Sequence, residues 1–179
     1  MPLKPATVIS NFWCIQYLAV CLYVLLARPT AVLSADRPFT VHKSIDFIHT
    51  NSPAMRMPTD CAVDSDRVVF VADGVNDRIL RFAPDGSFLD SIKLPGEHKL
   101  SGPVGLGAGA AGWLWIADTG KGRVLGLSPD RSTVRTIPVP ADSDNHPANL
   151  TDVAETPDGK SLWIVANNHH RLIRVDLES

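Results

Sequence analysis

Short apolar runs separated by turn-forming residues dominate the chain from about residue 58 onward. In the first such region the apolar, β-favouring runs are residues 61–63, 68–72, 79–82 and 88–92. Asp, Gly, Asn and Pro residues between them mark turns. No window of comparable length has the 3.6-residue periodicity of an amphipathic helix. The pattern therefore predicts four short antiparallel strands and an all-β fold.

This four-strand unit recurs at an offset of about 45 residues, the period of a β-propeller blade. The segments that match are residues 58–63 with 103–106, 70–73 with 115–118, 78–82 with 123–127, and 84–85 with 129–130. In a third copy, Thr151-Asp152 repeats Thr59-Asp60, and a turn one residue shorter precedes Arg171. We therefore expect blades at about residues 58–102, 103–149 and 150–179.

The first copy closely resembles the NHL repeat. The motifs that carry this resemblance are Pro58-x-Asp60-x-Ala62-Val63-Asp64, Val71-Ala72-Asp73, Asn76-Asp77-Arg78-Ile79 and Phe82-x-Pro84-Asp85-Gly86. The second copy has Arg131 where the motif has glycine, and the third is similar to the related YVTN type of blade. The resemblance covers residues 58–176. It implies about three four-stranded antiparallel β-propeller blades in an incomplete ring.

An NHL propeller usually closes with six blades, which takes roughly 270 residues at this period. The third copy here also ends without an outer strand. Three explanations remain open: the chain is a truncated or split product of a longer gene, two copies join as a homodimer that completes the propeller, or another partner completes an open arc. Residues 39–48 have the pattern of a strand. That segment could supply an outer strand to the last blade or simply flank blade 1.

The N-terminus has the pattern of an export signal. Lys4 precedes an apolar run at residues 12–27, and Leu33-Ser34-Ala35 is a candidate cleavage site. We expect residues 1–35 to form a signal helix that is cleaved or, alternatively, kept as a membrane anchor. Residues 36–57 then form an N-terminal segment with the candidate outer strand. A secreted or periplasmic location follows from this reading.

Charge and aromatic residues narrow the function classes. Only Lys4 and Arg28 of the 17 basic residues lie before residue 36, and none of the 19 acidic residues does, so the remainder carries about −4. That balance argues against binding nucleic acid or an anionic membrane.

We expect Cys61, which cannot form an intramolecular disulfide once the signal is removed, to be buried in a strand. We expect the tryptophans of the repeats to pack between blades: Trp113, Trp115 and Trp163.

Polar residues recur where the second strand of each copy ends. A ligand could bind to this loop face, for which the candidate residues are Asp73, Asp118, Asn167, His169 and His170. The alternative is structural, because Asp and Asn at such positions often accept hydrogen bonds from turn amides. Arg residues that follow five or four positions later are expected to pair with acids or carbonyls between strands: Arg78, Arg123 and Arg171.

Three histidines suggest a metal centre. His49, His98 and His146 are 49 and 48 residues apart, close to the blade period, and each precedes the first strand of a copy. Three imidazoles with an open fourth position form a catalytic zinc site. Zinc or calcium at one mouth of the propeller is therefore a candidate cofactor, while exposed loop histidines are the alternative.

Two functions remain in competition. The preferred one is a non-catalytic scaffold that binds a protein, peptide or glycan. The other is a metal-dependent lyase or lactonase-like enzyme of the kind that NHL-like propellers host, with its site in the propeller mouth. The sequence has no GxSxG, HExxH or phosphate-binding loop. Because a central site draws residues from several blades, half a ring favours the scaffold.

Overall fold

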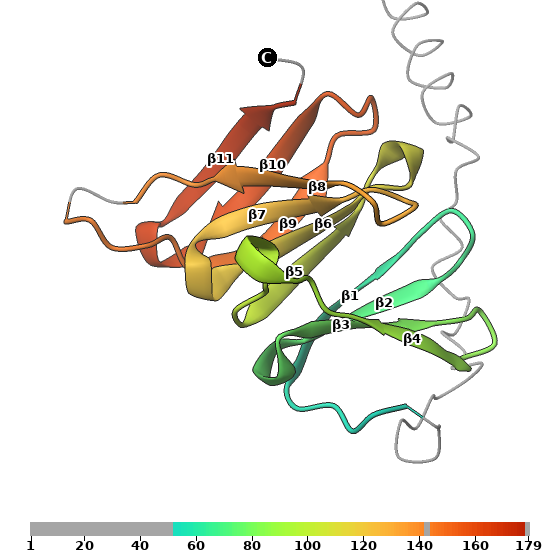
Figure 1. Cartoon of the computed structure of the whole chain (residues 1–179). Helices are drawn as coiled ribbons and strands as arrows, with labels where there is room; N and C mark the ends of the chain where they lie inside the picture. Colours follow the sequence, from blue (N-terminus) through green and yellow to red (C-terminus); the bar gives the residue numbers. More distant parts are fainter. Residues whose placement is uncertain (1–51, 142–143, 178–179) are drawn as a thin grey trace, which may run out of the picture. The chain divides into compact units, whose positions relative to one another are not determined.

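The structure is a computed structural model that describes residues 52–141 and 144–177, and within these ranges all regular structure is β-strand or short 3-10 helix (Figure 1). The expected signal helix, the candidate cleavage site and the candidate strand at residues 39–48 lie outside the described residues. In the described part of the chain, no helix is long and apolar enough to cross a membrane.

The strands form three antiparallel sheets, one for each sequence repeat. Blade 1 contains β1 (Pro58–Val63), β2 (Val69–Asp73), β3 (Arg78–Phe82) and β4 (Phe88–Ile92). Blade 2 contains β5 (Pro103–Ala108), β6 (Leu114–Asp118), β7 (Arg123–Leu127) and β8 (Val134–Pro138). Blade 3 contains β9 (Leu150–Glu155), β10 (Ser161–Ala166) and β11 (Arg171–Asp176). The expected four-strand unit is thus present twice, and the third sheet has three strands.

Strand register shows which residues of the blades are equivalent. The last residue of each second strand pairs with the first residue of the third: Asp73 with Arg78, Asp118 with Arg123, and Ala166 with Arg171. The 3-10 turns that join these strands are η1 (Gly74–Asn76), η4 (Thr119–Lys121) and η5 (Asn167–His169). The expectation of a shorter third turn was therefore wrong. Ala166, and not Asn167, occupies the position of the two aspartates.

Apolar side-chain clusters lie between neighbouring sheets and hold the blades together. The buried residues between blades 1 and 2 are Ala62, Ala72, Ile79, Ile92, Leu94, Leu100, Leu106, Leu114, Ile116, Leu125 and Leu127. Those between blades 2 and 3 are Trp115, Ala117, Val124, Val139, Ala148, Leu150, Val153, Leu162, Ile164 and Ala166. Because both faces of blade 2 are covered, its strand β6 is buried along its whole length.

Glycines allow the first strands of blades 2 and 3 to approach closely. A Cβ atom on Gly105 would lie 2.6 Å from the Cα atom of Asp152, and one on Gly107 would lie 2.5 Å from the carbonyl oxygen of Val153. Both distances are far inside van der Waals contact, and both neighbours are backbone atoms that cannot rotate away. Gly105 and Gly107 therefore set the spacing of β5 and β9.

We expect Gly107→Ala to lower the free energy of unfolding by about 1–3 kcal/mol, because the added methyl group overpacks the contact between β5 and β9. Urea unfolding followed by tryptophan fluorescence measures this change. The control is Ala108→Val, which adds atoms at an exposed position of the same strand and should shift stability by less than about 0.5 kcal/mol. Equal effects of the two substitutions would contradict the close approach.

Two expectations of burial were wrong, and they share one physical reason. Cys61 is exposed, although the residues at its register position, Leu106 and Val153, are 5% and 2% exposed. Trp163 is 40% exposed, whereas Trp115 at the same register position is 1% exposed. Each buried residue is covered by a neighbouring blade. Among the described residues, no further blade packs against the Cys61 side of blade 1 or the Trp163 side of blade 3.

Candidate functional site

A groove of about 580 Å³ runs across the first strands of all three blades. Its lining residues are Thr59, Asp60, Ala62, Val63, Leu106, Gly107, Ala108, Thr151, Asp152, Val153, Ala154 and Glu155. Strands β1, β5 and β9 are each the edge strand of their sheet. One edge of each strand therefore carries main-chain N–H and C=O groups that no strand of its own sheet pairs with.

Most polar side chains of the groove also join neighbouring blades. The Asp60 carboxylate accepts hydrogen bonds from the N–H groups of Cys61 and Leu106, both at 2.7 Å. Glu155 accepts hydrogen bonds from the N–H of Ala110 at 3.1 Å and from the indole N–H of Trp115. Blade 1 is thus bonded to blade 2, and blade 2 to blade 3, along the groove.

The groove is acidic. Its charged lining residues are Asp60, Asp152 and Glu155, and no Lys, Arg or His is among the lining residues. Asp152 is exposed, and its carboxylate accepts a hydrogen bond from the N–H of Val153 at 2.8 Å. Carboxylates of one sign along a concave surface produce a negative potential that attracts cations. Chemically, the groove offers hydrogen-bonding main-chain edges within a negative field.

Asp73 and Asp118 lie away from that groove lining and hold their own blades together. Both side chains are fully buried. Oδ1 of Asp118 accepts a hydrogen bond from the N–H of Ser101 at 2.6 Å, and Oδ2 pairs with Nε of Arg123 at 2.8 Å. Asp73 makes the same pair of contacts with the N–H of Arg56 and Nε of Arg78, at 2.7 and 2.6 Å. These carboxylates bind turn amides and arginines of the chain itself.

In blade 3 the equivalent loop amide is bound by a different residue, Asn168, which was not predicted from the sequence. The N–H of Asn149 donates to Oδ1 of Asn168 at 2.7 Å, and Nδ2 of Asn168 donates to the carbonyl of Pro147 at 3.1 Å. Asn149 precedes the last residue of β10, Ala166, by 17 positions, which is the spacing of the amides bonded to the two aspartates. That spacing is the signal that could have identified Asn168.

The remaining candidates of the loop face lie on the turn after β10. Asn167 is exposed, and its N–H donates to the carbonyl of Asn149 at 2.9 Å. His170 is exposed and closes the turn in a left-handed conformation with φ of 50°. The side chain of His169 lies outside the described residues. The structure therefore brings two exposed residues of this set to one turn.

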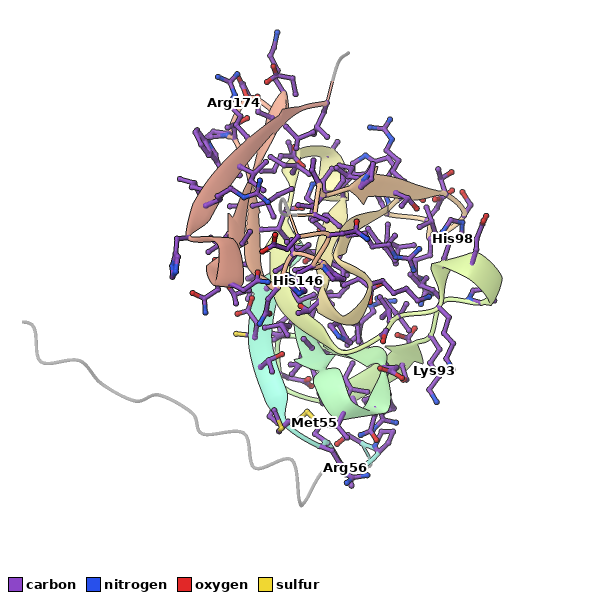
Figure 2. The ribbon with its side chains drawn as sticks, turned by 90° about the vertical axis from the view of Figure 1, so that its left-hand side faces the viewer. Met55, Arg56, Lys93, His98, His146 and Arg174 are labelled. Atoms are coloured by element: carbon purple, nitrogen blue, oxygen red, sulfur yellow. The ribbon has the colours of Figure 1, made fainter. Side chains whose placement is uncertain are left out.

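The proposed histidine trio is not assembled by the described residues. His98 ends η2 (Gly96–His98), with Nε2 3.5 Å from Oε1 of Glu97, and His146 is exposed in the loop before β9. Figure 2 shows these two residues well apart. His49 lies outside the described residues. Within the described ranges, no three His, Cys, Asp or Glu side chains gather as metal ligands.

Asp130 and Asp158 show that the turn acids have structural roles. The hydroxyl of Ser128 donates to Oδ1 of Asp130 at 2.6 Å, and this hydrogen bond, with those from Ser132, lowers the pKa of Asp130 to about 2. The hydroxyl of Thr156 donates to Oδ1 of Asp158 at 2.5 Å and likewise lowers the pKa of that carboxyl. Asp130 thus organises the turn between β7 and β8, and Asp158 the turn between β9 and β10.

We expect Ser128→Ala to raise the pKa of Asp130 from about 2 toward its ordinary value of 3.8, because the strongest donor to the carboxylate is lost. Since the folded-state pKa lies below the unfolded one, this stabilisation is present above pH 4 and disappears as the pH falls through about 2. An NMR titration of the carboxyl carbons measures both. Asp158 serves as the internal control, because its pKa should be the same in the wild-type protein and in the Ser128→Ala variant.

Comparisons with known proteins place this chain among β-propellers. No family model matches the sequence, and no curated protein matches it. Solved structures do match. A streptogramin B lyase superposes with a TM-score of 0.50 and 21% identity, over 65% of this chain and 39% of that one. The nidogen/laminin complex matches with a TM-score of 0.51 and 18% identity, over 65% and 42%.

A third structure, an auxiliary nutrient binding protein from Bacteroides ovatus, matches with a TM-score of 0.53 and 18% identity, over 70% of this chain and 29% of that one. At such low identity these matches show the fold alone. This chain spans about two fifths of the length of the lyase and nidogen chains. The three antiparallel sheets are therefore β-propeller blades.

Proposed function

We propose that this protein is an exported, NHL-like, non-catalytic binding scaffold, and that its acidic groove binds a basic, extended segment of a partner protein or peptide. The observation that carries the proposal is the composition of the groove: three strand edges with carboxylates and no basic side chain. The acid-free, apolar N-terminus supports export to a secreted or periplasmic location.

The edges of β1, β5 and β9 suit a peptide ligand. Extended peptides bind to exposed strand edges through main-chain hydrogen bonds, and the side chains on either side provide specificity. In this groove the nearby side chains are Asp60, Asp152 and Glu155, so Lys or Arg side chains of the ligand are favoured. The fold itself does not choose a function, because matching propellers include a lyase and a nutrient binding protein.

Two substitutions of opposite charge at one position test whether the groove binds a basic peptide. Ala108 is exposed and lines the groove at the end of β5. We expect Ala108→Arg to weaken binding of a Lys- and Arg-rich fluorescent peptide by about tenfold, which corresponds to roughly 1.4 kcal/mol of repulsion. Ala108→Glu adds similar bulk and should leave affinity equal or higher. Fluorescence anisotropy at two salt concentrations provides the measurement, and equal losses in both variants would contradict an electrostatic groove.

Metal analysis separates the scaffold from the enzyme alternative. Stoichiometric zinc or calcium in the purified protein, lost on substituting His98 and His146 with alanine, would favour a metal-dependent lyase or lactonase-like enzyme. In that case the Ala108→Arg and Ala108→Glu variants should bind the basic peptide with similar affinities. The scaffold proposal predicts instead that peptide affinity is unchanged in the two histidine variants, since neither residue lines the groove.

A further inference from the structure

We infer that a cavity between blades 1 and 2 binds an ω-ammonium carboxylate, a ligand whose ammonium group and carboxylate are separated by several carbon atoms. This inference does not depend on the acidic groove, because the two sites share no lining residue. It is carried by the opposite charges at the two ends of the cavity, by the apolar surface between them and by a buried N–H group of Arg81 that has no partner.

The cavity has a volume of about 190 Å³ and is lined by residues of the β1–β2 turn, of the β7–β8 turn and of the strands beside them. Its apolar lining comes from both blades and includes Phe70, Ile92, Leu114 and Leu127. These side chains belong to the cluster that joins blades 1 and 2 or pack against it. The cavity is therefore an unfilled part of that contact, and it offers an apolar surface to a chain of methylene groups.

Blade 2 fills the equivalent space with one of its own side chains. By strand register, Phe70 and Arg81 of blade 1 correspond to Trp115 and Gly126 of blade 2. The indole ring of Trp115 is 1% exposed and lies directly against Gly126, in the contact with blade 3. In blade 1 the smaller ring of Phe70 has the guanidinium of Arg81 5.8 Å from its centre. This exchange leaves space between blades 1 and 2 and places a cation beside it.

One end of the cavity carries two arginines, Arg81 of β3 and Arg131 of the β7–β8 turn. Their Nη1 atoms lie 3.2 and 2.9 Å from the same Oδ2 atom of Asp90 on β4. Because two guanidinium groups share one carboxylate, this end has an excess positive charge. The Nε–H group of Arg81 is buried without a hydrogen-bond partner in the described part of the chain. The Arg81 side chain is 21% exposed, so a rotation can turn this donor toward a carboxylate in the cavity.

The other end of the cavity carries two aspartates of the β1–β2 turn, Asp64 and Asp66. Oδ1 of Asp64 accepts a hydrogen bond from the N–H of Val68 at 2.8 Å, and Asp66 is exposed. This turn joins the first two strands of the sheet, whereas Arg81 and Asp90 lie on the third and fourth. Since neighbouring strands lie about 4.7–4.9 Å apart, the aspartates and the arginine pair are separated by roughly 10 Å.

This separation of charges selects the class of ligand. A carboxylate forms charge-assisted hydrogen bonds with the guanidinium groups, and an ammonium group is attracted to the two aspartates. The adjacent charges of an α-amino acid are too close together to reach both ends. Five carbon atoms between the two groups span about 7 Å, and a hydrogen bond of about 2.9 Å at each end covers the remaining distance. Two sources have this chemistry: a free ω-amino acid such as 6-aminohexanoate, and the C-terminal lysine of a polypeptide.

Isothermal titration calorimetry of the full chain with 6-aminohexanoate tests the cavity. We expect one molecule to bind per chain, and hexanoate and hexylamine, which each lack one charged group, to bind about tenfold more weakly. Nα-acetyl-lysine distinguishes the two sources. Binding as tight as that of 6-aminohexanoate assigns a C-terminal lysine, and clearly weaker binding assigns a free ω-amino acid. Hexanoate or hexylamine binding as tightly as 6-aminohexanoate, or no binding of either dipolar ligand, would overturn the inference.

Substitutions at the two ends test which group of the ligand each end contacts. Arg131→Gln should weaken 6-aminohexanoate binding about tenfold and leave hexylamine binding unchanged, whereas Asp66→Asn should weaken it similarly and leave hexanoate binding unchanged. Both residues are exposed, so the variants should fold. Arg135→Gln is the matched control, since Arg135 is an exposed arginine of the same blade that does not line the cavity. Equal losses of affinity in the Arg131 and Arg135 variants would contradict the site.

Discussion

Replacing Asp118 with alanine should lower the free energy of unfolding by about 3–5 kcal/mol, the cost of removing one partner from a buried ion pair. The side chain is fully buried, and it bonds both the N–H of Ser101 and Nε of Arg123. Without it, the arginine, 15% exposed, keeps a largely buried charge with no carboxylate. The loop that enters β5 also loses its attachment to the end of β6.

Chemical denaturation with guanidinium measures the Asp118→Ala effect, and two further variants define its origin. Asp73→Ala removes the equivalent pair in blade 1 and should cost a similar amount. Asn168→Ala removes only neutral hydrogen bonds at an exposed residue and should cost about 1 kcal/mol. A loss below about 1 kcal/mol for Asp118→Ala would contradict the structural role of this buried pair.

The repeat pattern of the sequence was sufficient to predict the fold. Its period and turn residues placed the strands within a few positions, and the strand at residues 88–92 is confirmed as β4 (Phe88–Ile92). This worked because each strand is a local apolar run bounded by turn residues, so little long-range information is needed. The expected arginine pairs are also confirmed for Arg78 and Arg123.

Residue roles that depend on neighbouring blades were harder to predict. The pattern around Cys61 and Trp163 is the same as around Leu106 and Trp115, but burial depends on whether another blade covers the position. Asn168 was missed because its role is performed by a side-chain amide and not by a carboxylate, and because Asn168 lies at a different position of the turn from the two aspartates. Comparing the repeats identifies equivalent positions, but the role of a residue depends on which of its atoms reaches the N–H group of the loop.

The acidic groove was also not evident from the sequence. Asp60 and Asp152 occupy equivalent positions of the repeat, and Glu155 follows Asp152 by three residues, but the sequence does not show that the three side chains line one groove. They come together because the first strands of successive blades lie side by side, which is a property of the packed blades and not of one repeat. The sequence therefore directed attention to the loop face with Asp73 and Asp118, whose carboxylates are fully buried.

Trp115→Ala should lower the free energy of unfolding by about 3–5 kcal/mol, the usual cost of truncating a buried aromatic residue. Trp115 is 1% exposed, and its indole ring occupies the space beside Gly126, where a Cβ atom would lie 2.3 Å from the ring. The ring also stacks on Trp113 with centroids 5.7 Å apart, and its N–H donates to Glu155 of blade 3. One side chain thus joins two strands of blade 2 to blade 3.

Trp163→Ala is the matched comparison for this second prediction, because Trp163 has the same register position in blade 3 and is 40% exposed. Measured by urea unfolding, its cost should be below about 1 kcal/mol, because the ring is only partly covered. Equal costs for the two tryptophans would contradict the packing described for blade 2.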